Sequence, residues 1–438
     1  MSNVGTWMQN LANGWLIYQL TLKHSPLWLG LLGLSFALPM TVLPLFSGTI
    51  VDRTNRIRLL WITQTGMMLV AFVLAVSAWL HVINVWEILA GSFVSAALLA
   101  FDNPARQALV PELVPRADLL NALSLNSATY NGAALVGPAV GGALLGIFGA
   151  ALLYFVNGLS FLAVMWALVI MRDVRTHAGG GATSFRRSMT DGFAFAWRNR
   201  LVALLLGLSA VAALFGRGYQ NLLPIFAANI WHGGPRSYGI LLAAGGAGAL
   251  VGAFTLAAVR VVRRQTAILI GSGAVFAASI IAFAVAPGYW AGVALMFVAG
   301  VSSTVMGTLI GTFIQIEVPD ELRGRVMSLY TITLIGLPAM GALVVGSLAE
   351  ALGGVTGAPR AVLIGAVVFA VLLALSAPII VRAHVEAQTG REAAEERASA
   401  PGSRSDGKSS ARIVAAADPE ELEGLCRAED EDSATPRG

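Results

Sequence analysis

Cysteine is nearly absent from this sequence, since Cys426 is the only one among 438 residues. A single cysteine excludes a disulfide framework within the chain and any metal site built from several cysteines. The histidines are scattered and show no metal-ligand spacing, so the sequence predicts no metal site; they are His24, His81, His177, His232 and His384.

Charge is also scarce. Only 12% of the residues are charged, 56% are hydrophobic, and the mean hydropathy is +0.74. Long windows with almost no charge are what a helix needs to cross a hydrocarbon core of about 30 Å. The composition therefore excludes a soluble globular chain and predicts an all-α membrane protein. Lysine is limited to Lys23 and Lys408, and we attribute the high pI to arginines that set membrane topology, not to nucleic-acid binding.

Apolar runs between charged or Pro/Gly-containing breaks predict twelve transmembrane helices in two parallel-repeat six-helix bundles. Their approximate ranges are 4–21, 27–50, 59–80, 86–104, 119–146, 148–171, 201–229, 237–259, 266–286, 289–314, 326–352 and 359–382. The predicted parts are an N-terminal bundle over 1–171, a cytoplasmic linker with an amphipathic helix over 172–200, a C-terminal bundle over 201–382 and a disordered cytoplasmic tail over 383–438.

Arginine is distributed unevenly over the connections between these segments. Arginine-rich connections lie near 53–58, 106–116, 172–200, 260–264 and 323–325, and they alternate with connections that carry only Lys23, Arg236, Arg360 and three histidines. Basic connections stay on the cytoplasmic side of a membrane. This alternation predicts a multi-pass protein of the cytoplasmic membrane with both termini in the cytoplasm.

One offset relates the two halves of the chain. A shift of 204 residues places Gly48 on Gly252 and Gly142 on Gly346. A shared offset between two halves of equal orientation predicts a parallel duplication about an axis along the membrane normal.

The connection after the second segment reads Gly48-Thr-Ile-Val-Asp52-Arg53-Thr-Asn55-Arg56-Ile-Arg58. It resembles the signature loop of the major facilitator superfamily, Gly-x-x-x-Asp-Arg-x-Gly-Arg-x-x. Asn55 replaces the second glycine, and asparagine is the other residue that best tolerates a left-handed turn. The resemblance implies a latch on the cytoplasmic side formed by Gly48, Asp52, Arg53 and Arg56. A basic loop that only sets topology is the alternative.

The fifth segment contains Gly137-Pro138-Ala-Val-Gly141-Gly142. This stretch resembles the core of the superfamily's antiporter motif, which accompanies export in the family. Proline removes a helix hydrogen bond and the glycines leave a smooth groove, so this helix can bend and pack tightly. Ordinary small-residue packing between membrane helices explains the same pattern.

Two further stretches resemble the branch with enterobactin-exporter-like and effector-secretion transporters: Gly5-Thr-Trp7-Met8-Gln9 and Phe101-Asp102-Asn-Pro104-Ala-Arg106-Gln107. Asp102 and Arg106 share one helical face, so they either belong to the latch or form a plain intrahelical ion pair. Members of this branch have more sequence before the first stretch. We therefore expect a truncated first helix of about 17 or 18 residues.

Polar side chains inside apolar segments are costly in lipid, which makes them candidate substrate contacts. The candidate cavity residues are Gln9, Asn10 and Asn13 in the first segment and Arg217, Gln220 and Asn221 in the seventh. Arg217 lies near the middle of its segment, where an arginine needs water, an acidic partner or an anionic solute. A structural arginine is the alternative for this residue.

The resemblance implies a monomeric secondary transporter that exports small hydrophobic or amphipathic molecules by alternating access. Drugs, siderophores and secondary metabolites are all within this class. The implied partners are the small-molecule substrate and the lipid bilayer, with no nucleic acid. Uptake by the same fold, or a non-transporting scaffold or sensor, are the alternatives.

Neither an enzyme nor a cofactor is predicted. No nucleophile, base and orienting group can be assembled from residues expected to lie together. The stretch from Gly402 to Ser409 fits a phosphate-loop pattern, yet it lacks the strand and helix that such a loop requires. Proton antiport is implied by the resemblance alone, because no predicted segment has a carboxylate near its middle.

Overall fold

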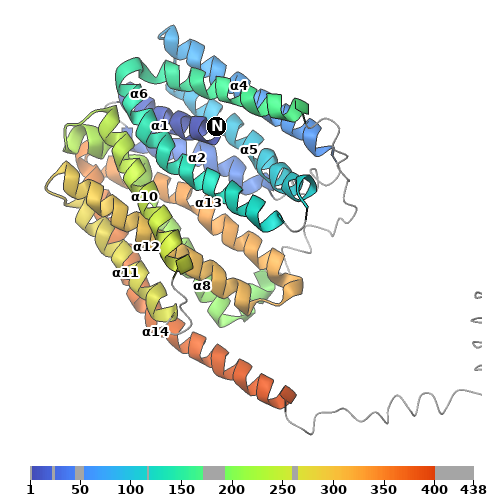
Figure 1. Ribbon diagram of the computed structural model, residues 1–438. Helices are drawn as coiled ribbons and strands as arrows, with labels where there is room; N and C mark the ends of the chain where they lie inside the picture. The colour runs from blue at the N-terminus through green and yellow to red at the C-terminus, as the bar shows by residue number, and fades with distance from the viewer. Residues whose placement is uncertain are drawn as a thin grey trace, which may run out of the picture. The chain divides into compact units, whose positions relative to one another are not determined.

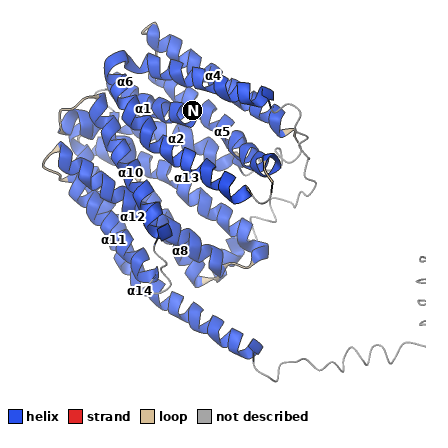
Figure 2. Cartoon of the chain, viewed as in Figure 1, coloured by secondary structure: helices blue, strands red, loops and turns tan. Residues whose placement is uncertain are grey.

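The computed structural model describes residues 2–21, 25–44, 54–115, 118–170, 193–258 and 265–399. Within these ranges every regular element is a helix (Figure 2). Nine of the described helices are long and apolar enough to cross a membrane, and a shorter apolar helix covers Pro26–Val42. The prediction of an all-helical membrane fold is confirmed, while the count of twelve spans stays a prediction.

The N-terminal half contains α1 (Ser2–Leu20), α2 (Ser25–Val42), α4 (Arg56–Trp79), α5 (Val85–Leu113) and α6 (Leu119–Ile170). The 52-residue α6 is interrupted at Gly149, whose φ of 76° is non-helical. Only glycine adopts such a backbone at little cost. The interruption falls where the sequence predicted one segment to end and the next to begin.

Asparagine side chains cap the N-termini of α4 and α5. Asn55 has extended backbone angles, φ −61° and ψ 115°, and its side chain accepts a hydrogen bond from the Arg58 amide at 3.0 Å. The expectation that Asn55 occupies a left-handed turn is therefore wrong. Asparagine is suited to this position because its short side chain satisfies an amide that the first turn leaves unpaired.

The C-terminal half begins with an irregular span and continues with long regular helices (Figure 1). The irregular span consists of α8 (Arg200–Val211), η1 (Ala212–Gly216), η2 (Gly218–Leu222), α9 (Leu223–Ile225) and η3 (Phe226–Ile230). The regular helices are α10 (Pro235–Ala258), α11 (Gln265–Ala284), α12 (Tyr289–Glu317), α13 (Asp320–Ala351) and α14 (Ala358–Ser399), with a short η4 (Gly354–Gly357) before the last.

Two predicted boundaries need correction. The single helix predicted over 201–229 is broken at Arg217, between a π-helical and a 3-10 turn. The last helix was expected to end at 382 and to give way to a disordered tail, yet α14 continues to Ser399. The chain divides into compact units at 1–382 and 383–438, and the first unit contains every predicted site residue.

The two halves of this first unit meet through two pairs of helices. Helix α13 packs along α2, and α6 packs along α10 (Figure 1). The offset of 204 residues that relates Gly142 of α6 to Gly346 of α13 predicts that these two pairs are equivalent. The contacts are those expected of a duplicated bundle.

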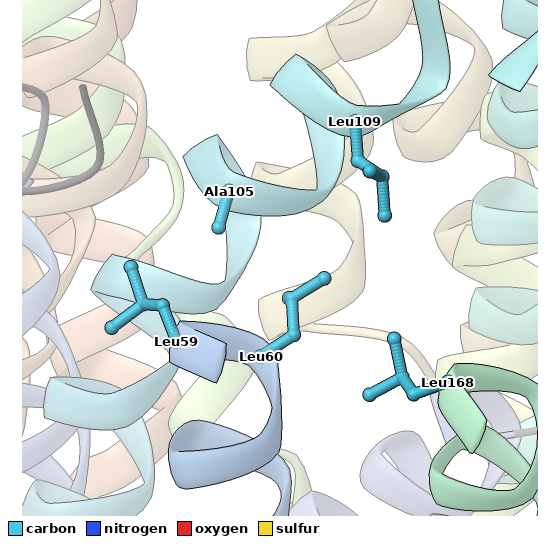
Figure 3. Close-up of a cluster of buried hydrophobic side chains, with 5 residues drawn as sticks. All are labelled: Leu59, Leu60, Ala105, Leu109 and Leu168. Carbon is cyan, nitrogen blue, oxygen red and sulfur yellow. The ribbon is translucent and has the colours of Figure 1, made fainter. Parts of the chain in front are cut away.

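Apolar side chains fill one seam of the N-terminal half and also cover its outside. Leu59 and Leu60 of α4 meet Ala105 and Leu109 of α5 and Leu168 of α6 (Figure 3). The outward face of α4 is apolar as well, since more than half of the surface of Ile62, Leu69 and Val73 is exposed. An apolar exterior of this kind is what lipid requires.

Candidate functional site

Two of the predicted cavity amides are bonded within their own half of the protein. Gln9 and Asn13 of α1 are buried, with 4% and 2% of their surfaces exposed. Asn157 Nδ2 donates to Gln9 Oε1 at 2.7 Å, and the Tyr154 hydroxyl donates to Asn13 Oδ1 at 2.8 Å. These amides are therefore bonded to α6, and their role as substrate contacts stays a prediction.

A hollow of mixed character lies beside these amides. Its wall is lined by Thr6, Gln9, Asn10, Asn13, Phe36, Met67, Ser92, Ser95, Leu99, Asn157 and Phe161. No charged side chain is among these residues, so the hollow suits a neutral group that makes hydrogen bonds and carries an apolar part. Asn10, half-buried, lines it as the sequence suggested.

Sequence reasoning missed Tyr154 and Asn157. The signal was present, because both are polar residues inside the apolar segment predicted over 148–171. Their register against α1 could not be read from the sequence. The hydrogen bonds to Gln9 and Asn13 depend on that register.

The second group of predicted cavity residues surrounds the break at Arg217. Arg217 is half-buried and lines a hollow between α8, α12 and α13, whereas Gln220 is exposed. Asn221 lies against α2 of the other half, since a Cβ on Gly33 would sit 2.6 Å from Asn221 Nδ2. The structure thus separates the three residues, and only Arg217 enters the hollow.

Asp102 lies at the centre of a polar network between α4 and α5. Its side chain is fully buried. Thr63 Oγ1 and Gln64 Nε2 donate to Asp102 Oδ1 at 2.9 and 2.7 Å, and Arg106 donates to Oδ2 at 2.7 Å. A buried carboxylate with three donors is satisfied both in charge and in hydrogen bonds. Asp102 and Arg106 thus form the intrahelical ion pair that was one of the two readings of their spacing.

Most of the predicted latch lies outside the described residues. This applies to Gly48, Asp52 and Arg53. Arg56 is described and is the first residue of α4. The latch remains a prediction from the resemblance.

The glycine motif of α6 contacts two different helices. A Cβ on Gly137 would lie 2.6 Å from Trp7 Cβ, and one on Gly141 would lie 3.1 Å from Met8 Cγ, so these glycines accommodate α1. A Cβ on Gly142 would instead lie 2.7 Å from Gly239 Cα of α10. Pro138 lies at the same close contact between α6 and α10, which we call a glycine crossing, because its carbonyl oxygen faces Gly239. The motif therefore allows close contact within one half and between the halves.

An equivalent crossing joins α13 to α2. A Cβ on Gly346 would meet the Pro26 carbonyl and lie 3.4 Å from Gly30 Cα. In the first crossing Gly142 meets Pro235 and Gly239 in the same way. The first turns of α2 and α10 thus share the pattern Pro-x-x-x-Gly, at Pro26–Gly30 and Pro235–Gly239. Sequence reasoning missed this repeat.

Aromatic side chains pack next to the Gly142–Gly239 crossing. Trp15 of α1 is 5% exposed and stacks on Tyr238 of α10, with ring centroids 6.2 Å apart and an interplanar angle of 23°. Trp15 also contacts Tyr18 at 5.4 Å between centroids. A Cβ on Gly14 would lie 2.8 Å from Tyr238 Oη. This aromatic contact joins α1 to α10.

The sequence profile that describes transmembrane secretion effectors matches residues 1–403. The chain belongs to this family of major facilitator transporters. Members of the family are transporters and not enzymes, so the chain is a multi-pass membrane transporter. The resemblance stated from the sequence is confirmed, and the branch is the expected one.

Characterised relatives of this secretion effector family member include exporters. The staphyloferrin A transporter of Staphylococcus aureus is 23% identical over 358 residues, which cover 80% of this chain and 87% of the relative. The multidrug efflux pump Tap of Mycobacterium tuberculosis is 27% identical over 371 residues, covering 81% and 85%. The enterobactin exporter EntS of Escherichia coli is 29% identical over 281 residues, covering 61% and 62%.

A solved structure has the same fold. It is a bacterial homologue of the human lysosomal transporter Spinster in an inward-facing, unoccupied conformation. The TM-score is 0.69 at 14% sequence identity, and the match covers 88% of this chain and 97% of the other. At this identity the likeness concerns the fold alone.

Proposed function

We propose that this secretion effector family member exports small hydrophobic or amphipathic molecules across the cytoplasmic membrane by alternating access, driven by the proton gradient. Drugs, siderophores and secondary metabolites are the substrate classes. Two of the relatives, a multidrug efflux pump and an enterobactin exporter, support the direction of transport.

One observation carries the mechanism: the two halves meet through two equivalent glycine crossings. At each crossing one backbone lies against another with no side chain between them. Smooth surfaces of this kind have few interlocking side chains to separate, so two rigid halves can rock against each other. In the topology predicted from the arginines, both crossings belong to the extracellular half of the membrane. This supports a state that is closed toward the outside and opens toward the cytoplasm.

The proposal predicts lower accumulation of exported compounds in cells that produce the protein. The anion 1-pyrenebutyrate and the dyes ethidium and Hoechst 33342 are suitable fluorescent compounds, measured against cells that carry an empty vector. We expect steady-state accumulation to fall severalfold, and the difference to disappear when a protonophore collapses the proton gradient, because export against a gradient needs an energy source.

Three other outcomes have distinct meanings. Higher accumulation in producing cells would show uptake. A difference that persists without the proton gradient would refute proton coupling. Unchanged accumulation of every compound, with normal membrane levels of the protein, would favour the scaffold or sensor interpretation.

A further inference from the structure

Arg217 is a positive charge near the middle of a membrane span without an acidic partner among the described residues. It lies between Arg200 and Ile230, which bound the span, at the junction of η1 and η2. Among the described residues, the ionisable groups that interact with its guanidinium are the phenols of Tyr219 and Tyr330, and no carboxylate is one of them. An arginine at the centre of a membrane is energetically costly and normally faces a partner or a water-filled cavity. Within the described part of the chain, no group balances this charge.

The other polar groups near Arg217 are already bonded to each other. Ser209 and Thr333 share a hydrogen bond of 2.6 Å between their hydroxyls. Thr333 Oγ1 donates to the Tyr330 carbonyl at 2.7 Å, and the Tyr330 hydroxyl donates to the Gly307 carbonyl at 2.6 Å. Because the hydroxyls of Ser209 and Thr333 have used their hydrogens, the guanidinium N–H groups of Arg217 are the side-chain donors that the lining of the hollow offers to a ligand.

The hollow in front of the guanidinium has largely apolar walls. Besides Arg217, Ser209, Thr333 and Gly307, its lining consists of Ala212, Ala213, Met306, Ile310 and Leu334. Gly307 leaves the guanidinium accessible, since a Cβ at this position would lie 4.0 Å from Arg217 Nη2 and 3.8 Å from Tyr330 Oη. The hollow therefore combines the guanidinium of Arg217 with an apolar wall.

We propose that this hollow binds the anionic head group of the transported molecule, a carboxylate or a similar singly charged group with an apolar body. The planar guanidinium can donate two parallel hydrogen bonds to such a head group. A single cation in an apolar wall matches one negative charge better than several. The inference rests on the proposed export function and names its substrate class as amphipathic organic monoanions.

The test compares two probes that differ only in charge. Purified protein in phosphatidylcholine nanodiscs is dialysed against 1-pyrenebutyrate or its uncharged amide, 1-pyrenebutanamide, and binding to empty nanodiscs is subtracted. We expect the protein to bind the carboxylate at least tenfold more tightly than the amide. In Arg217→Gln the ratio of the two affinities should fall to about one, with little change in the affinity for the amide. Arg217→Lys should retain part of the preference, because it keeps the charge but loses the planar guanidinium.

Two further variants separate a binding role from a structural one. Arg236→Gln removes an exposed arginine at the start of α10 and should leave the preference unchanged. Gly307→Val keeps the charge but fills the space beside the guanidinium, so it should weaken carboxylate binding even if Arg217→Gln fails to fold. A wild-type protein without preference for the carboxylate, or unaltered carboxylate binding in folded Gly307→Val, would overturn the proposal.

Failure of this inference can be told apart from failure of the export proposal. Binding in nanodiscs requires neither a proton gradient nor a direction of transport. Export in cells without carboxylate preference would leave the function intact and refute the substrate class. If the protein prefers the carboxylate through Arg217 but raises accumulation in cells, the proposed binding site stands and the direction of transport is uptake.

Discussion

Gly142→Ala is expected to reduce export strongly, whereas Gly146→Ala, one turn further along α6, should leave it nearly unchanged. A Cβ on Gly142 would lie 2.7 Å from Gly239 Cα and 3.0 Å from the Pro235 carbonyl, whereas one on Gly146 has no atom within 4 Å. Overpacking of this kind costs about 1–3 kcal/mol. Because the cost arises only when α6 and α10 are in contact, the ratio of the two conformations should shift by roughly 5–150-fold.

Spin labels can measure this shift directly. Trp86 at the start of α5 and Trp290 at the start of α12 are 69% and 72% exposed, and they belong to opposite halves. With Cys426 replaced by serine, labels on Trp86→Cys and Trp290→Cys report the separation of the predicted extracellular ends by pulsed electron paramagnetic resonance. We expect a longer distance in Gly142→Ala and the unaltered distribution in Gly146→Ala. Identical distributions and identical export in both variants would show that the crossing does not control the conformation.

Asp102→Asn is expected to destabilise the protein, while Glu87→Gln on the same helix should have little effect. Asparagine at 102 retains an acceptor for Thr63 and Gln64 but directs an amide N–H₂ group at Arg106. Two hydrogen-bond donors then face each other without an acceptor. Removing one partner of a buried pair costs about 3–5 kcal/mol. Arg106 is 34% exposed and can regain water, so we expect roughly 2–3 kcal/mol here.

Thermal unfolding in detergent, followed by tryptophan fluorescence, measures this effect. A loss of this size should lower Tm by roughly 5 °C. Glu87 is only partly buried near the beginning of α5, where its charge contributes a few tenths of a kcal/mol. If Asp102→Asn keeps its Tm but loses export, Asp102 serves the conformational latch and the structural interpretation is wrong.

The sequence predicted the second crossing only in part, for a geometric reason. The offset of 204 residues relates Gly142 to Gly346, but their partners Gly239 and Gly30 are separated by 209 residues. The two halves thus differ by five residues between the motifs, and one fixed offset cannot align both. Which residue a glycine faces also depends on the packing of separate segments, which composition does not specify.

The environment of Arg217 shows a similar limit. The position of Arg217 near the middle of the span could be predicted by counting residues. The flanking Gly216 and Gly218 were also visible in the sequence. The irregular turns depend on α13 as well, because a Cβ on Gly218 would lie 2.8 Å from Val345 Cγ2 and press on the Gly341 carbonyl. Helix breaks imposed by tertiary contacts leave no local pattern to read.

The two glycine crossings also determine how the halves can move. The halves also touch beyond these crossings, since a Cβ on Gly246 would lie 3.1 Å from the Ala134 carbonyl and one on Gly33 would lie 3.1 Å from Ala342 Cβ. Sliding is resisted because a carbonyl oxygen of Pro138 faces Gly239 and that of Pro26 faces Gly346, so each backbone sits in a notch of the other. Opening toward the outside therefore has to separate main-chain contacts in both helix pairs together, and neither pair can open alone.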